Sequence, residues 1–258
     1  MEQEQHSSAS EVVTVDHLSL SFGEKKVLQD FSLALKKSEN LVVLGKSGSG
    51  KSVLIKCIVR LIQPDKGKIT VLGEDILNME KQPLDQLRRR IGFLFQSDAL
   101  YDSMTVRENL AFPLRTADEE KPESEKEELI MEALQNVGLE KTADQYPSEL
   151  SGGMKKRISL ARTLMLKPEI IFYDEPTSGL DSITGAEISD LIVEVKEKYK
   201  TSSIIISHDM YCAKVASDRV AVLIDGKCHT TGTYDELEQS DDEQVTQFFT
   251  HGHGNENK

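Results

Sequence analysis

Runs of apolar residues separate the expected strands of this chain from its expected helices. Short continuous runs, typical of buried strands, occur at positions 41–44, 91–95, 170–173, 204–206 and 220–224. Apolar residues recur instead at helical spacing over 53–62, 127–137, 151–166 and 184–198. Strands that are apolar on both faces and alternate with helices indicate a mainly parallel sheet.

The pattern changes along the chain and indicates separate parts. Apolar and polar residues alternate near the N-terminus over 13–20 and 31–35, which predicts two strands, and Asp225-Gly226 predicts a hairpin turn. Strand patterns disappear between 97 and 166, where helical patterns dominate. We therefore expect a disordered lead-in (1–10), an α/β core (11–96 and 167–232), an inserted helical subdomain (97–166) and an acidic C-terminal tail with a short amphipathic piece (233–258).

Composition and charge narrow the function classes. The 258 residues are 38% hydrophobic and 29% charged, as in ordinary globular proteins, and no run approaches the ~20 apolar residues that cross a bilayer. A net charge of −13 argues against a nucleic-acid partner. The polar start of the chain lacks an apolar signal segment, and the three cysteines lack metal-ligand spacing, so we expect a reducing compartment.

A phosphate-binding loop follows the apolar run at 41–44. It consists of Gly45, Lys46, Ser47, Gly48, Ser49, Gly50, Lys51 and Ser52, the pattern G-x-x-x-x-G-K-S between an expected strand and an expected helix. Its glycines allow the backbone N–H groups to approach an anion, and the helix adds its positive N-terminal end. Lys51 is then placed to reach the β- and γ-phosphates, and the Ser52 hydroxyl to bind Mg²⁺. The loop predicts binding of a nucleoside triphosphate.

Two carboxylates, Asp174 and Glu175, follow the apolar run at 170–173. In proteins with a phosphate loop, an Asp at this position holds Mg²⁺. Glu175 would face the γ-phosphate and activate the attacking water as a general base. An acidic pair after a strand is usually only a polar loop, and the phosphate loop is what favours the catalytic interpretation.

Ser151, Gly152 and Gly153 stand before an amphipathic helix and form a second candidate anion site. A serine hydroxyl, glycine N–H groups and a helix N-terminus together suit a phosphate. A helix cap with a flexible entry is the simpler alternative. One triphosphate can bind to the phosphate loop and to this second site only if the two sites face each other.

Several motifs, taken in order, resemble those of ATP-binding cassette (ABC) ATPases. Walker A corresponds to 45–52, the Q-loop glutamine to Gln96, the signature to 150–154, Walker B to 170–175, the D-loop to 178–181 and the H-loop to His208. The resemblance spans about 12–232. It implies a P-loop, RecA-like core with an N-terminal antiparallel β subdomain and a helical signature subdomain. It also implies ATP and Mg²⁺ as cofactors.

The resemblance further implies roles for single residues. Two chains would form a head-to-tail dimer, with each ATP between Walker A of one chain and 151–153 of the other. Gln96 would contact Mg²⁺ or the lytic water, His208 would hold the γ-phosphate, and Asp181 would connect the two sites. Phe22 stands where the family stacks an aromatic residue, more usually Tyr, on adenine, although a core position is its alternative.

Within the family, the chain is most similar to the MlaF-type (Mla/Mce) ATPases of phospholipid transport. The shared features are Met154 after the signature glycines, the stretch 94–115, the lead-in 147–150 to the signature, and 245–249. This similarity implies an integral MlaE-like permease, other Mla/Mce components as partners, and a place on the cytoplasmic face of the bacterial inner membrane. A coupling helix of the permease would bind at the segment after Gln96.

Two alternatives remain open. A cassette of iron–sulfur assembly or cell division would keep the ATPase without the transporter, and the similarity over 94–115 speaks against it. The other alternative is a P-loop kinase or GTPase, in which the signature residues would have no known role. The sequence also contains no Asn-Lys-x-Asp, the tetrapeptide with which GTPases recognise guanine. Because each site would need the signature of a second chain, we expect activity per chain to rise with protein concentration or with assembly on the permease.

Overall fold

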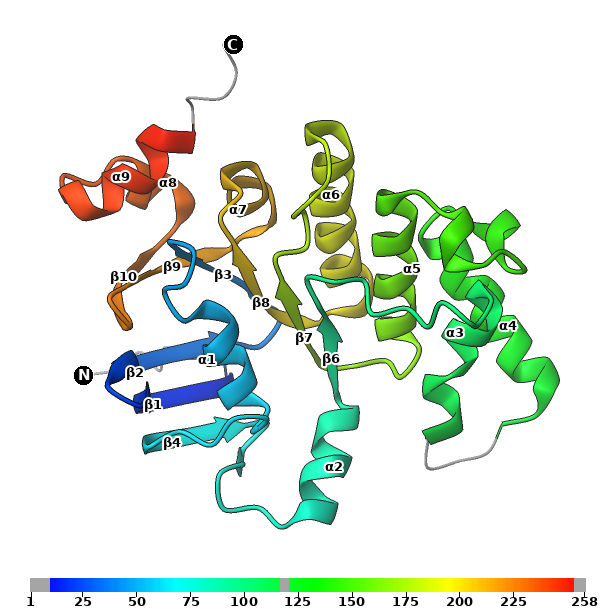
Figure 1. Cartoon of the computed structure of the whole chain (residues 1–258), viewed down its shortest axis with the longest axis horizontal. Coiled ribbons are helices and arrows are strands. Elements are labelled where there is room, and N and C mark those ends of the chain that lie inside the picture. The colour runs from blue at the N-terminus through cyan, green and yellow to red at the C-terminus, as the bar shows by residue number, and fades with distance from the viewer. Residues whose placement is uncertain (1–9, 117–120, 253–258) are drawn as a thin grey trace, which may run out of the picture.

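In the part of the chain that the computed structural model describes, residues 10–116 and 121–252, the strands form two sheets (Figure 1). The larger sheet has the order β10 (Lys227–Gly232), β9 (Arg219–Ile224), β3 (Asn40–Gly45), β8 (Ser202–Ser207), β7 (Ile170–Asp174), β6 (Ile91–Leu94). The smaller sheet has the order β2 (Lys25–Lys36), β1 (Glu11–Phe22), β4 (Lys66–Val71), β5 (Glu74–Asp75) and is antiparallel. Strands β9 to β6 run parallel, and only β10 is antiparallel to its neighbour.

Both faces of the larger sheet are covered, which explains the continuous apolar runs. Every residue of β3, β7 and β8 is buried. One face packs against the smaller sheet, α1 (Lys51–Ile58) and α2 (Lys81–Arg89). The other packs against α5 (Gly152–Leu164), α6 (Ser182–Tyr199) and α7 (Met210–Ala216). The expected α/β fold with a mainly parallel core sheet is confirmed.

Residues 97–166 form helices, and no strand occurs in the part of this segment that is described. The elements are α3 (Val106–Ala111), η1 (Pro113–Thr116), α4 (Glu123–Asn136), η2 (Glu140–Thr142), η3 (Pro147–Glu149) and α5. They lie beside the β6 edge of the sheet in Figure 1. Helix α3 is too short to show helical periodicity, but Thr105 and Glu108 form a capping box that fixes its start.

The C-terminal segment packs against the core. The sequence predicts an acidic tail with one short amphipathic piece, and the structure shows α8 (Tyr234–Glu238) and α9 (Glu243–Gly252) there. Their buried residues are Tyr234, Leu237, Val245 and Phe249. These side chains belong to the same hydrophobic cluster as one face of the larger sheet. The expected disordered lead-in lies outside the described residues up to position 9.

The β9–β10 hairpin joins the two sheets. Its turn is the predicted Asp225-Gly226, which accepts hydrogen bonds from Gln29 of β2: Gln29 N donates to Gly226 O (2.8 Å) and Gln29 Nε2 to Asp225 O (2.9 Å). Gly226 has φ of 76°, and a Cβ there would lie 2.5 Å from the Val27 carbonyl oxygen. The contact between the sheets therefore requires glycine at this position.

We expect Gly226→Ala to lower the free energy of unfolding by about 2–4 kcal/mol, from left-handed strain plus overlap with a backbone carbonyl. Gly23→Ala is the matched control, because Gly23 also has a positive φ (59°) but no atom lies within 4 Å of its Cβ position. Gly23→Ala should lower the free energy of unfolding by about 1–2 kcal/mol, from backbone strain alone. Equal midpoint shifts for the two variants in urea unfolding would contradict the close contact at Gly226.

Candidate nucleotide-binding site

The phosphate loop connects the end of β3 to the start of α1. Gly48 and Gly50 have φ of 75° and 105°, which favour glycine, and Gly50 is the N-cap of α1. A Cβ on Gly50 would lie 3.0 Å from Val27 Cγ1 and Val27 O. The sequence thus folds here into a tight loop whose backbone N–H groups and helix N-terminus suit an anion.

Lys51 lies buried inside this loop, with 7% of its side chain exposed. Its Nζ donates to Gly45 O (2.6 Å) and to Lys46 O (3.3 Å), and lies 3.8 Å from Glu175 Oε1. Burial lowers the pKa of Lys51, and the nearby Glu175 and Asp174 carboxylates oppose that shift. The ammonium therefore stands between the loop and the acidic pair, within reach of any phosphate that the loop holds.

Ser52 and Asp174 meet although 122 positions separate them. The Ser52 Oγ, on the first turn of α1, donates to Asp174 Oδ1 at the end of β7 (2.9 Å). Hydroxyl and carboxylate oxygens are ligands that Mg²⁺ accepts, and the ion commonly takes one or two protein oxygens together with phosphates and water. Ser52 and Asp174 could therefore supply the protein oxygens of such a site.

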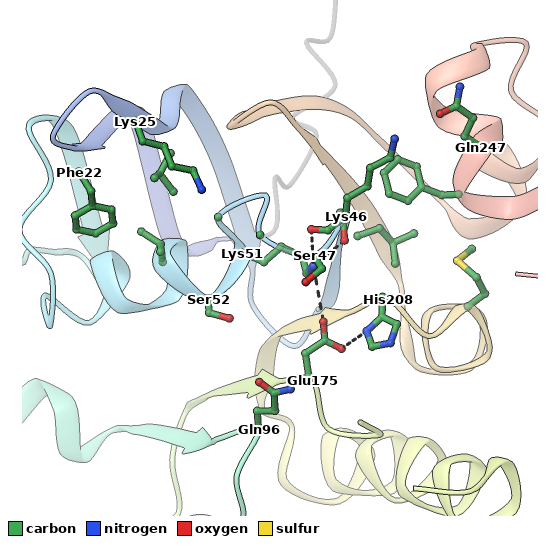
Figure 2. A pocket seen from close by; sticks show the side chains of 18 residues that line it. Phe22, Lys25, Lys46, Ser47, Lys51, Ser52, Gln96, Glu175, His208 and Gln247 are labelled. Carbon is green, nitrogen blue, oxygen red and sulfur yellow. Dashed lines mark hydrogen bonds and ion pairs between the residues drawn. The ribbon is translucent and has the colours of Figure 1, made fainter. Parts of the chain in front are cut away.

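Glu175 sits one residue beyond β7 in a left-handed backbone conformation (φ 52°). Its N–H donates to Ile206 O of β8 (2.9 Å), and its Oε2 lies 2.7 Å from His208 Nδ1. Left-handed non-glycine residues cost free energy and concentrate at functional sites. The two oxygens of one carboxylate thus face two different groups, Lys51 and His208, as Figure 2 shows.

Asp174 is linked through its hydrogen bond to Ser52 to a cleft of about 780 Å³ at the carboxyl ends of the parallel strands. Lys51, Ser52, Glu175 and His208 line this cleft (Figure 2). Gln96 enters it after β6, with Nε2 at 3.5 Å from Ser178 Oγ. Phe22 lies across the cleft from the Glu175 side, with 51% of its surface exposed, so it is not a core residue. An exposed aromatic ring beside a phosphate loop suits a flat base.

Other lining residues escaped the sequence analysis. They are Lys25, Val27, Met210, Gln247 and Phe248. Gln247 and Phe248 come from α9, about 200 positions after the phosphate loop in the sequence. The amphipathic pattern at 245–249 is visible in the sequence, but only the packing of α9 against the core brings it to the cleft.

The second candidate anion site does not line this cleft. Ser151 is the N-cap of α5, and its Oγ accepts from Met154 N (3.3 Å). Asp181 is likewise the N-cap of α6, and hydrogen bonds from the Thr184 side chain and backbone lower its pKa. Ser151 and Asp181 are exposed and lie outside the cleft. The structure thus brings the phosphate loop and the residues around Glu175 together, and it leaves the signature and Asp181 away from them.

A family model described as ABC transporter matches residues 28–178, more than half of the chain. The chain belongs to the ABC transporter family. The solved ATP-binding cassette MJ0796, a dimer in a post-hydrolysis state bound to ADP and Pi, is 30% identical, with a TM-score of 0.78 over 86% of this chain and 98% of that one. The cbiO1 protein of Clostridium perfringens, part of the ABC transporter complex cbiONQ, is 28% identical with a TM-score of 0.81 over 88% and 90%.

Named ABC relatives cover nearly all of this chain. The probable ribonucleotide transport ATP-binding protein mkl of Mycobacterium leprae is 39% identical over 92% of this chain and 68% of its own length. The intermembrane phospholipid transport system ATP-binding protein MlaF of Haemophilus influenzae is 35% identical over 92% and 90%. The glycine betaine/proline betaine transport system ATP-binding protein ProV of Escherichia coli is 38% identical over 91% and 58%. The chain is thus an ATP hydrolase, the ATP-binding subunit of a transport system.

The two glycines of the ABC signature differ in their surroundings. A Cβ on Gly153 would lie 2.4 Å from Thr184 Cγ2, whereas a Cβ on Gly152 would lie 3.4 Å from the flexible end of Leu180. Both glycines are in the first turn of α5, where alanine has the higher helix propensity. Packing therefore requires glycine at position 153 but not at position 152.

We expect Gly153→Ala to lower the free energy of unfolding by about 1–3 kcal/mol, because the methyl group overlaps Thr184. Gly152→Ala is the control and should be neutral or slightly stabilising, within about 0.5 kcal/mol. Calorimetry of the two variants without nucleotide measures the difference. A Gly152→Ala variant as unstable as Gly153→Ala would refute this difference in packing.

Proposed function

We propose that this chain powers phospholipid transport between bacterial membranes, as the ATPase of an Mla-type ABC transporter. Percentage identity does not select this substrate, because mkl and ProV are as similar as MlaF. The resemblance of the stretch after Gln96 and of the residues around Met154 to the MlaF-type ATPases supports it.

The observation that carries the ATPase mechanism is the convergence of Lys51 and His208 on Glu175. Lys51 binds the β- and γ-phosphates, and His208 holds the γ-phosphate after exchanging its contact with Glu175. Glu175 takes a proton from the attacking water as general base. Ser52, Asp174 and Gln96 would hold Mg²⁺, which would neutralise phosphate charge. Phe22 stacks on adenine.

Ser151, Gly152, Gly153 and Asp181, which lie outside the cleft, act on a second chain. In a head-to-tail homodimer, the signature of one chain covers the γ-phosphate held by the phosphate loop of the other, and Asp181 connects the two sites. Charge-assisted hydrogen bonds from such a cover are worth about 1.5–3 kcal/mol each, so a monomer should be slow. The dimeric state of the related cassette MJ0796, which is bound to ADP and Pi, supports a dimer.

The described part of the chain contains no helix long and apolar enough to cross a membrane. In this proposal the ATPase lies on the cytoplasmic face of the inner membrane, bound through an MlaE-like permease and with further Mla/Mce components. ATP closes the dimer, hydrolysis reopens it, and the segment after Gln96 transmits the motion. Nucleic acid is no part of this assembly.

Glu175→Gln should lower kcat for ATP at least ~100-fold by removing the general base, while the Kd for ATP stays within about threefold. The same variant should form a stable dimer with ATP. Glu169→Gln is the control, because Glu169 flanks the opposite end of β7 and pairs with Arg90 at the surface. Turnover assays, isothermal titration and mass measurement in solution check these values. Wild-type turnover by Glu175→Gln would exclude Glu175 as the base.

The transport proposal predicts that the tagged chain, purified from detergent-solubilised membranes of its own host, brings a multi-spanning permease with bound phospholipid. Mass spectrometry of the complex identifies both. The matched control is the same purification from a strain lacking the tag. A permease that carries a hydrophilic solute, or a complex with soluble proteins alone, would contradict phospholipid transport and leave the ATPase assignment intact.

A further inference from the structure

Thr184, in the first turn of α6, contacts both partner-facing loops of its own chain. Its Oγ1 donates to Asp181 Oδ2 at 2.6 Å. Its methyl Cγ2 faces the bare Cα of Gly153, so closely that a Cβ there would lie only 2.4 Å away. The signature and the D-loop therefore meet at one side chain, where α5 and α6 lie side by side (Figure 1).

The two oxygens of the Asp181 carboxylate accept hydrogen bonds from different groups. Its Oδ1 caps α6 by accepting from Ile183 N (3.1 Å) and Thr184 N (3.0 Å). Its Oδ2 accepts from Thr184 Oγ1 and from no other group among the described residues. The helix cap holds Oδ1 in place, and the hydrogen bond from the Thr184 hydroxyl holds Oδ2 in place.

A second contact joins α5 and α6 further along the two helices. Arg157 Nη2 donates to Glu187 Oε2 at 2.7 Å, which joins the second turn of α5 to α6. Leu180, just before Asp181, lies beside Gly152, since a Cβ on Gly152 would be 3.4 Å from Leu180 Cδ2. These contacts restrain the helices, whereas Thr184 joins Asp181 itself to a signature glycine.

We propose that Thr184 is a positioning residue that locks Asp181 and the signature glycines into one unit, so that both reach the partner's nucleotide site together. This inference rests on the proposed head-to-tail dimer. Threonine suits the task because it supplies a hydroxyl for Asp181 and a methyl for Gly153 on one stiff, β-branched side chain. Serine keeps only the hydroxyl, and valine keeps only the methyl and the shape.

The test uses full-length chain with four changes: Thr184→Val, Thr184→Ser, Gly153→Ala and the double change Gly153→Ala with Thr184→Ser. Removing the Thr184 methyl relieves the 2.4 Å overlap, because the next atom, Thr184 Cβ, lies 3.8 Å from the position that a Cβ on Gly153 would take. Each protein is measured for kcat, for ATP Kd, for thermal unfolding, and, with Glu175→Gln added, for ATP-driven dimerisation.

Thr184→Val should lower kcat and raise the protein concentration needed for the dimer by about tenfold, since it loses a hydrogen bond to a charged group. Its ATP Kd and its unfolding temperature should stay near wild type, a split that a purely structural role would not give. Gly153→Ala should also lose about tenfold or more in kcat. Because Gly153 itself belongs to the signature, the double change is judged by thermal unfolding, where its unfolding temperature should return close to that of Thr184→Ser.

A Thr184→Val variant with wild-type kcat and dimerisation would overturn the inference, as would a double change no more stable to heat than Gly153→Ala. Failure of the proposed function gives a different result. In that case the Glu175→Gln chain without any change at 184 or 153 stays monomeric at saturating ATP.

Discussion

The contact between Lys51 and Glu175 is the point on which the site depends. The two residues follow β3 and β7, which are separated in the sheet by β8, and His208 follows β8 itself. Parallel strands put their carboxyl ends at one edge, so the three side chains meet without any long loop. The buried ammonium and the left-handed Glu175 are both held by backbone carbonyls of the strands.

This geometry places the two candidate phosphate-binding loops of the chain apart from each other. The loop after β3 lies in the cleft, whereas Ser151 at the start of α5 and Asp181 at the start of α6 are exposed outside it. The second group is rigid within its own chain, because Gly153 leaves room for Thr184 and Asp181 accepts a hydrogen bond from its hydroxyl. Under the dimer proposal, one chain supplies the base and the other supplies a preorganised cover.

Sequence patterns predict the parts of the fold that have strong periodicity or a fixed local motif. The buried strands, the phosphate loop, α4, α5, α6 and the turn at Asp225-Gly226 all correspond to elements of the structure. Helices α3, α7 and α8 are not predicted, since they have only five to seven residues each. Helix α2 is also not predicted: it has nine residues, but only Leu84 and Leu87 of them are buried, too few to show a helical period. Among site residues, Lys51, Glu175 and His208 are identified by motif order, and their mutual contacts require the sheet.

Some contributions have no signal in the sequence. Gln247 and Phe248 reach the cleft only through the packing of α9, and a threonine three residues after Asp181 is indistinguishable from any polar residue in the first turn of a helix. Its importance comes from an interhelical contact with Gly153, on a different helix. Long-range packing of this kind follows from the fold and not from local propensity.

Complementation between two inactive chains tests the shared site most directly. Lys51→Ala removes the phosphate contact and leaves the signature, whereas Ser151→Arg blocks the signature and leaves the phosphate loop. Each variant alone should be inactive, and the mixture should regain up to about a quarter of wild-type turnover per chain, because about half of the dimers carry one intact site. A mixture as inactive as its components, or either variant active alone, would contradict a site built from two chains.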